Sequence, residues 1–330
     1  MNLGYCTRIL LMALCTLLLP LLPAAAELDG RTQGGDSGDR TDSGQTVRLH
    51  LRGEDGTCIR VVTAGVRTRN ADPSPPSASG VITLPAGPSE DNIIWAGLYW
   101  VILADLPPSI AVTLNGDPVT AEALSVTGSP CWPEEHAYPF FADVTALVVP
   151  GANAIDGLED GGVLATSPES EGASLVVVYE DPETTACEIL VTDGNDLLNA
   201  PGQIVDLPLP LTCGDDREAT LTFIGADGQT GAHGSAPDDQ IWNGAPLGNQ
   251  DDWNASDPGA SGAEPDLSWD TDPWPVVTGG GNLASVEIPL LGGPGDCVNW
   301  IATVIEVGVQ QCQPVPAESS TWGQIKSRFR

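Results

Sequence analysis

Residues 93–103 read IIWAGLYWVIL, a nearly unbroken apolar run, and this stretch decides the fold class. An apolar run of this length is typical of a central β-strand that is covered on both faces of its sheet. Residues 173–180 (ASLVVVYE) and 298–307 (VNWIATVIEV) have the same character. The chain also contains 38 glycines and 29 prolines among its 330 residues, which leaves little room for long helices. The sequence therefore predicts an all-β fold.

Shorter alternating segments lie between these runs, and the second half of the chain repeats their order. Ile110, Val112 and Leu114 alternate into Asn115-Gly116, a dipeptide that favours a two-residue hairpin turn. The matched pairs of segments are 114–118 (LNGDP) with 242–246 (WNGAP), 143–145 (DVT) with 274–278 (WPVVT), and 173–180 with 298–307. This repetition predicts two tandem β-sandwich domains with a jelly-roll-like arrangement.

The predicted boundaries follow from composition and from this repeat. The first sandwich opens near Thr46, because Val47, Leu49 and Leu51 alternate with polar residues as in a half-buried strand. The predicted segments are 1–26 (signal peptide), 27–45 (flexible leader), 46–182 (first β-sandwich), 183–213 (connecting segment), 214–312 (second β-sandwich) and 313–330 (C-terminal tail).

The beginning of the chain has the features of a signal peptide. Arg8 precedes the apolar residues 9–22, and Ala24 to Ala26 provide small residues for cleavage after Ala26. The alternative is a membrane anchor, but the apolar run is shorter than the roughly 20 residues that span a bilayer. We therefore expect a secreted or cell-surface protein with no membrane span in the mature chain.

The charge of the chain excludes some classes of partner. The formal net charge is −33 at pH 7, and Lys326 is the only lysine. Cleavage after Ala26 would remove one arginine and no acid, so the mature charge would be 11 − 45 = −34. Such a charge repels nucleic acid and anionic lipid. We expect no nucleic-acid partner.

Cleavage would also leave an even number of cysteines, which in an exported chain favours disulfides. These are Cys58, Cys131, Cys187, Cys213, Cys297 and Cys312. The alternative is metal binding, but no pair of cysteines has the C-x-x-C spacing. Six cysteines allow fifteen pairings. We expect Cys297 and Cys312 not to be joined to each other, because the segment between them has the sequence of one continuous strand and would hold them too far apart.

An acidic insertion in the second half is the best candidate for a metal site. Oxygen ligands on loops are those that Ca²⁺ takes in proteins. The candidate ligands are Asp238, Asp239, Asp251, Asp252, Asp257, Asp270 and Asp272, with Asp266 nearby. Asp193, Asn195 and Asp196 form a smaller candidate that lacks the EF-hand spacing. Two interpretations are open, a calcium site or loops that are polar for solubility and turn formation.

The same insertion carries four tryptophans, at positions 242, 253, 269 and 274. Exposed tryptophan rings stack on sugars, whereas buried ones fill a sandwich core. Core packing is the interpretation we favour.

No catalytic motif is present in the sequence. The nucleophile motif G-x-S-x-G is absent, and His50, His136 and His233 lie far apart in the chain. We therefore expect a protein without enzymatic activity. The alternative is a secreted polysaccharide hydrolase, because such enzymes need only a pair of carboxylates and 45 acidic residues offer many pairs.

Three stretches resemble a domain family of unknown function found in secreted and surface proteins of bacteria and archaea. They are GLYWVIL (97–103), GASLVVVYEDP (172–182) leading into Asp193–Leu197, and the region from Trp269-Asp270 to Trp300. The resemblance covers about residues 90–310 and implies fold and compartment only. Residues 320–326 (STWGQIK) resemble a short tail that ends unrelated secreted bacterial proteins, which implies sorting or attachment.

Together these features predict a structural or binding module of the cell exterior. Its loops would hold Ca²⁺ and contact a glycan or a cell-surface protein.

Overall fold

The computed structural model describes residues 40–42, 44–52, 59–69, 77–128, 132–161, 167–181, 186–198, 203–210, 217–226, 240–247, 257, 269–278, 283–288 and 298–308. Every regular element in these ranges is a β-strand, which confirms the all-β prediction. In this part of the chain, no helix has the length and apolar character needed to cross a bilayer.

The first half of the chain forms two sheets. The first inner sheet has the order β3 (Ile59–Arg67), β12 (Glu169–Glu180), β5 (Ile93–Ala104), β10 (His136–Asp143) and β8 (Glu122–Ala123), and β9 (Thr127–Gly128) also pairs with β10. The first outer sheet has the order β4 (Ser77–Thr83), β11 (Ala152–Glu159), β6 (Thr113–Leu114) and β7 (Asp117–Pro118).

The second half forms two more sheets, joined by strands from the N-terminal segment. The second inner sheet has the order β18 (Trp269–Val277), β15 (Glu218–Ala226), β20 (Val298–Gly308), β13 (Ala186–Leu198) and β2 (Thr46–Arg52). The second outer sheet has the order β1 (Arg40–Asp42), β14 (Gln203–Pro208), β19 (Leu283–Ile288), β16 (Ile241–Trp242) and β17 (Ala245–Pro246).

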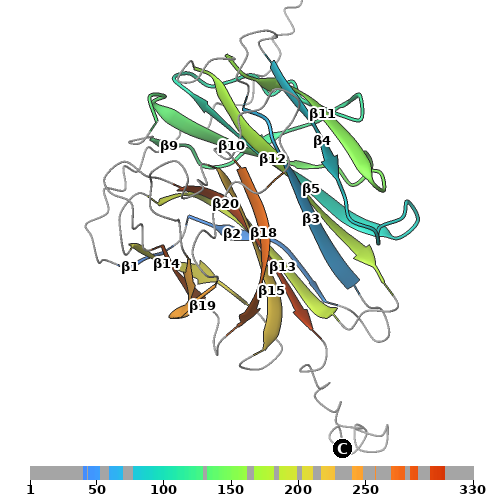
Figure 1. The fold of residues 1–330 in the computed structure, drawn as a ribbon, viewed down its shortest axis with the longest axis vertical. Helices are drawn as coiled ribbons and strands as arrows, with labels where there is room; N and C mark the ends of the chain where they lie inside the picture. Colours follow the sequence, from blue (N-terminus) through green and yellow to red (C-terminus); the bar gives the residue numbers. More distant parts are fainter. Residues whose placement is uncertain are drawn as a thin grey trace, which may run out of the picture.

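The four sheets stack as four layers, with an apolar core between each pair of neighbours. In Figure 1 they run from β4 and β11 at the upper right, through the two inner sheets, to β14 and β19 at the lower left. Trp100 fills the core between the first two sheets, and Trp300 fills the core between the last two. A third core, which includes Tyr99 and Trp269, lies between the inner sheets. We call it the junction core.

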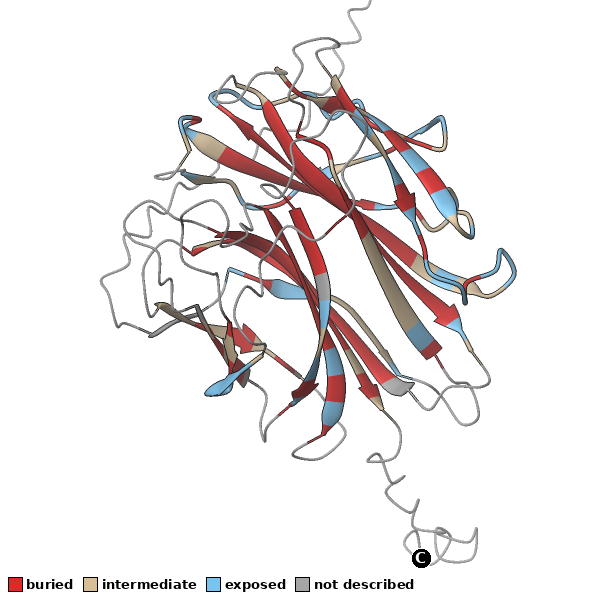
Figure 2. Ribbon diagram, in the orientation of Figure 1, coloured by how far each residue is buried: buried red, intermediate tan, exposed pale blue. Residues whose placement is uncertain are grey.

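Strand β5 shows why its sequence is apolar without alternation. Leu98, Trp100 and Ile102 face the core of the first half, whereas Tyr99 and Val101 face the junction core. Since both faces of the strand are covered by protein, both sets of side chains are apolar. Figure 2 shows buried residues along β5 and its neighbour β12, whereas buried and exposed positions alternate along the outer strands β4 and β11. The prediction of a doubly covered central strand is confirmed.

The two halves have the same strand order. The first half has β3-β12-β5-β10 and β4-β11-β6-β7, and the second has β13-β20-β15-β18 and β14-β19-β16-β17. Their hairpin turns also agree, since Asn115 (φ 55°) and Asn243 (φ 50°) each precede a glycine with positive φ. Both turns are flanked by a backbone hydrogen bond of 2.9 Å, Val119 N to Val112 O and Leu247 N to Gln240 O. The segments that we matched in sequence therefore occupy matching places in the fold.

The structure differs from the sequence prediction at three elements. Arg40–Asp42 lies in the segment that is predicted to be a flexible leader, but as β1 it pairs parallel with β14. The strand Thr46–Arg52 was assigned to the first sandwich, but as β2 it pairs with β13 in the second inner sheet. The segment 183–213 was expected to be a connection, but it contains β13 and β14. Strand β13 carries a polar stretch, Asp193 to Asp196, at an irregularity in its pairing with β20. These polar residues gave the segment the appearance of a loop.

The predicted cysteine pairs involve residues outside the described ranges. Cys58, Cys131, Cys213, Cys297 and Cys312 lie outside the described residues, and Cys187 is placed in β13 by its backbone alone. Their pairing remains a prediction.

The tryptophans of the second half are partly described. Trp269 lies in the junction core and Trp242 in the core of the second half, both buried. Trp274 packs against that second core, and Trp253 lies outside the described residues. Core packing is therefore confirmed for Trp242 and Trp269.

Candidate functional site

Arg48 of β2 lies where the two halves meet and contacts both of them. Its Nε donates a hydrogen bond of 2.6 Å to Asp193 Oδ2 on β13. Its terminal nitrogens lie 3.2 Å from the two carboxylate oxygens of Glu122 on β8, and the guanidinium stands 4.2 Å from the centre of the Phe141 ring. Tyr99 on β5 also donates to Asp193 Oδ2, at 3.3 Å. We call these five residues the Arg48 cluster.

The protonation states of the Arg48 cluster follow from burial and from its ion pairs. Burial alone would lower the pKa of Arg48, but the hydrogen bonds that Arg48 donates to Asp193 and Glu122 outweigh burial and raise that pKa. Burial raises the pKa of Asp193, and the Arg48 guanidinium opposes this shift. Burial and the Asp193 carboxylate also raise the pKa of Tyr99. The tyrosine therefore acts as a hydrogen-bond donor to the carboxylate.

The residues just before β2 insert into the second half. Gly44 N donates to Asp196 Oδ1 at 2.8 Å, and Thr192 and Thr303 donate to Gln45 Oε1 at 2.8 and 3.2 Å. Asp196 is buried, and its Oδ2 has no hydrogen-bond partner among the described residues. Burial raises the pKa of Asp196 to about 6, although the Gly44 hydrogen bond opposes the shift.

The smaller calcium candidate does not form one ligand set. Asp193 binds Arg48, whereas Asp196 binds Gly44. Asn195 donates to Ser125 O at 2.7 Å, and its own Oδ1 accepts a hydrogen bond of 2.7 Å from Asn299. Across the described ranges, no group of three or more His, Cys, Asp or Glu side chains has a geometry that could hold a metal ion.

Most of the acidic insertion lies outside the described residues. Asp238, Asp239, Asp251, Asp252 and Asp266 lie outside the described residues, and Asp272 is placed in β18 by its backbone alone. Asp257 and Asp270 are described, and both are buried. The carboxylate of Asp257 accepts a hydrogen bond of 2.6 Å from Thr271 Oγ1, and its backbone oxygen accepts one of 2.7 Å from Arg67 Nε. The described part of the insertion thus contacts both inner sheets, and calcium binding stays a prediction.

A second charged group lies in the first half and was not singled out from the sequence. Arg69 lies 2.6 Å from Glu169 and 3.4 Å from Glu171 at the start of β12. Burial raises the pKa of the nearby Glu134, and the negative charge of Glu169 raises it further.

The signal for both charged groups was available in the composition. The chain has only 12 basic residues against 45 acidic ones. Four of these basic residues, Arg48, Arg60, Arg69 and Arg217, pair with a carboxylate in or beside the sheets. In so acidic a chain, a basic residue within or beside a predicted strand indicates a buried carboxylate partner.

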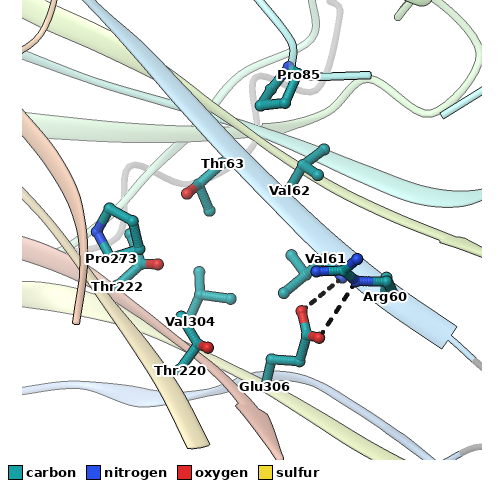
Figure 3. A pocket seen from close by; sticks show the side chains of 10 residues that line it. All are labelled: Arg60, Val61, Val62, Thr63, Pro85, Thr220, Thr222, Pro273, Val304 and Glu306. Carbon is teal, nitrogen blue, oxygen red and sulfur yellow. Dashed lines mark hydrogen bonds and ion pairs between the residues drawn. The ribbon is translucent and has the colours of Figure 1, made fainter. Parts of the chain in front are cut away.

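A cleft of about 210 Å³ lies between the edge of β3 and the face of the second inner sheet. Figure 3 shows Thr63, Thr220, Val304 and Glu306 around this space, with Arg60 at its rim. Arg60 lies 3.5 Å from Glu306, whose Oε2 also accepts a hydrogen bond of 3.2 Å from the backbone N–H of Val61. Burial raises the pKa of Glu306, against the effect of these two donors.

These features define an all-β protein of the β-sandwich type, in which buried charged groups connect the sheets. The chain belongs to the family described as "Protein of unknown function (DUF3344)", whose model matches residues 68–262. A comparison with curated proteins finds no match.

Among solved structures, the chain is similar to one titled as the crystal structure of peptide-N(4)-(N-acetyl-β-D-glucosaminyl) asparagine amidase. The two sequences are 14% identical, and the match covers 76% of this chain and 97% of the other. Its TM-score is 0.25, which is too low to transfer fold details or activity.

Proposed function

We propose that this protein is an exported, non-catalytic module of the cell exterior that binds a glycan or another protein. The observation that carries the proposal is that the charged side chains at the junction of the two halves are bound to other side chains of the protein. A catalytic group must reach a substrate, whereas the Asp193 carboxylate is bound by Arg48 within its own sheet and by Tyr99 from across the junction. The side chain of Asp193 is 1% exposed. These charges stabilise the contact between the two inner sheets.

Export is supported by the sequence of residues 1–26, and the charge of −33 suits a protein that stays apart from other copies of itself. Calcium on the acidic insertion would neutralise part of this charge and stabilise the fold. The stacked cores provide a rigid body from which loops can contact a partner.

The test is incubation of the mature protein, residues 27–330, with a panel of immobilised and soluble glycans. The proposal predicts retention on one or more glycans, or on a cell-surface protein fraction, without release of new reducing ends. The matched variant is Glu134→Gln, because Glu134 is one of the described carboxyl groups whose pKa is raised by burial, as a general acid requires. Release of reducing ends by the wild type and its loss in Glu134→Gln would establish the polysaccharide hydrolase instead.

A further inference from the structure

Among the described strands, the duplicated topology leaves one edge of the first half without the strand that its counterpart has. In the second inner sheet, β2 pairs antiparallel with the outer edge of β13, from Glu188 opposite Arg52 to Asp193 opposite Thr46. The counterpart of β13 in the first half is β3, which ends the first inner sheet. No described strand pairs with the outer edge of β3.

The hydrogen-bonding groups on this edge can be assigned from one contact. Val61 N–H is bound by the Glu306 carboxylate, so it points away from β12. Successive residues of a strand direct their backbone groups to opposite sides, so Ile59 and Thr63 also present theirs outward. A carboxylate oxygen therefore occupies the place that a carbonyl of an added strand would take.

The cleft beside this edge has the lining that an extended peptide needs. Its residues are Arg60, Val61, Val62, Thr63, Pro85, Thr220, Thr222, Pro273, Val304 and Glu306. They are β-branched, hydroxyl-bearing or proline side chains with one ion pair (Figure 3), and none of the ten is an aromatic platform for a sugar ring. β-Branched and hydroxyl side chains pack well against the side chains of a neighbouring strand.

The strand on the matching edge indicates the charge of the occupant. Strand β2 reads TVRLHLR, and two of its basic side chains bind carboxylates of β13, Arg48 with Asp193 and His50 with Glu188. At the β3 edge the carboxylate at the rim is Glu306, within a chain of net charge −33. We propose that the outer edge of β3 binds an extended, basic segment of a partner protein as an additional antiparallel strand.

This inference rests on the proposed binding function and names its partner class. Backbone hydrogen bonds to Thr63 and Val61 would supply affinity, and a basic side chain of the partner would pair with Glu306 once the backbone of the partner replaces it at Val61. The edge would otherwise be protected by Glu306 against pairing with other chains.

The test uses a fluorescent peptide with the sequence of residues 46–52 as the probe, because this strand fills the matching edge. Its binding to mature protein is followed by fluorescence anisotropy. Thr63→Pro removes one outward N–H, which an edge strand tolerates, whereas Thr63→Ala keeps it. We expect wild type and Thr63→Ala to bind alike, and Thr63→Pro to bind about tenfold more weakly or less.

A second pair of variants keeps the test decisive if Thr63→Pro does not fold. Glu306→Arg reverses the charge at the rim and should also weaken binding about tenfold. Asp117→Arg makes the same change at an exposed position of the first outer sheet and should have no such effect. Equal binding by Glu306→Arg and Asp117→Arg, or no saturable binding by the wild type, overturns the inference. Glycan retention in the preceding experiment would then still support the proposed function.

Discussion

Arg48 is a basic side chain whose contacts lie 145 and 74 residues away in the chain, on Asp193 and Glu122. The carboxylate of Asp193 is almost fully buried, and burial of an uncompensated charge costs several kcal/mol. Arg48 therefore stabilises the fold mainly because its positive charge offsets the cost of burying the negative charge of Asp193.

Replacing Arg48 by methionine should lower the free energy of unfolding by about 3 kcal/mol, because Asp193 then loses its partner. The double variant Arg48→Met/Asp193→Asn should recover a large part of this loss, since neither charge remains. Urea denaturation of the wild type, both single variants and the double variant gives the interaction energy. Additive losses in the double variant would show that the two residues are not coupled.

The buried carboxyl group of Asp196 makes the stability of the folded chain depend on pH. Its pKa in the folded chain is about 6, above the value of 3.8 for the unfolded chain. The folded state therefore holds the proton more tightly, so stability falls as the pH rises from about 4 to about 6. Above pH 6 the full penalty applies, at most about 3 kcal/mol for a shift of about two units.

Asp196→Asn should therefore raise the melting temperature relative to the wild type at pH 8, and the gain should vanish near pH 4. The measurement is a series of melting curves between pH 4 and pH 8. Asp117→Asn, at an exposed position, serves as the control for a lost surface charge. A gain that is equal at pH 4 and pH 8 would contradict the burial of a charged Asp196.

At the scale of elements, the strands that could be predicted are those whose own residue pattern reflects how each face is buried. Residues 93–103 are apolar throughout because β5 has a core on each face. The Asn-Gly turns could be predicted because both need positive φ at the asparagine, which few other residues adopt.

The elements that could not be predicted depend on distant partners. Nothing within β2 specifies that it pairs with β13 rather than with a strand of its own half. That choice depends on the carboxylates Glu188 and Asp193, which meet His50 and Arg48 only after folding. The stretch from Asp193 to Asp196 resembles a loop in sequence. Within the fold, Tyr99, Asn299 and Gly44 each donate a hydrogen bond to one of its side-chain oxygens.

The acidic insertion carries a prediction about calcium. Ca²⁺ should raise the melting temperature, because a ligand at a hundredfold excess over its Kd stabilises the folded state by about 2.7 kcal/mol. Asp251→Asn and Asp252→Asn should abolish this effect. The control is NaCl at equal ionic strength, since screening alone stabilises a chain of net charge −33. Equal shifts from the calcium and sodium salts would mean that no specific site exists.

At the scale of the whole molecule, we expect residues 317–330 to determine where the protein is located and to contribute nothing to the stability of the fold. Residues 317–330 follow Pro314 and Pro316 and carry Lys326, Arg328 and Arg330, three of the 12 basic residues. Deleting them should leave the melting temperature unchanged and move the protein from the cell-associated to the free fraction. A lower melting temperature, or an unchanged distribution, would contradict this expectation.

The two inner sheets share the junction core. The N-terminal strands β1 and β2 belong to the sheets of the second half, although the whole first half lies between them and that half in the sequence. Strands β1 and β2 precede every strand of the first half, yet they pair with β14 and β13. The Arg48 cluster adds contacts from β2 to β8 and β10. We therefore expect the two halves to unfold together, and β2 to be necessary for their cooperation.

Differential scanning calorimetry of two truncated proteins tests this central claim, that the charged junction exists to hold the sheets together. A chain that begins at residue 40 keeps β1 and β2 and should melt in one transition close to that of the mature protein. A chain that begins at residue 53 lacks both strands and leaves Asp193 without Arg48. Its melting temperature should fall by more than about 10 °C, or its single transition should split. If it melts like the mature protein, the junction does not hold the sheets together, and its charged residues need another explanation.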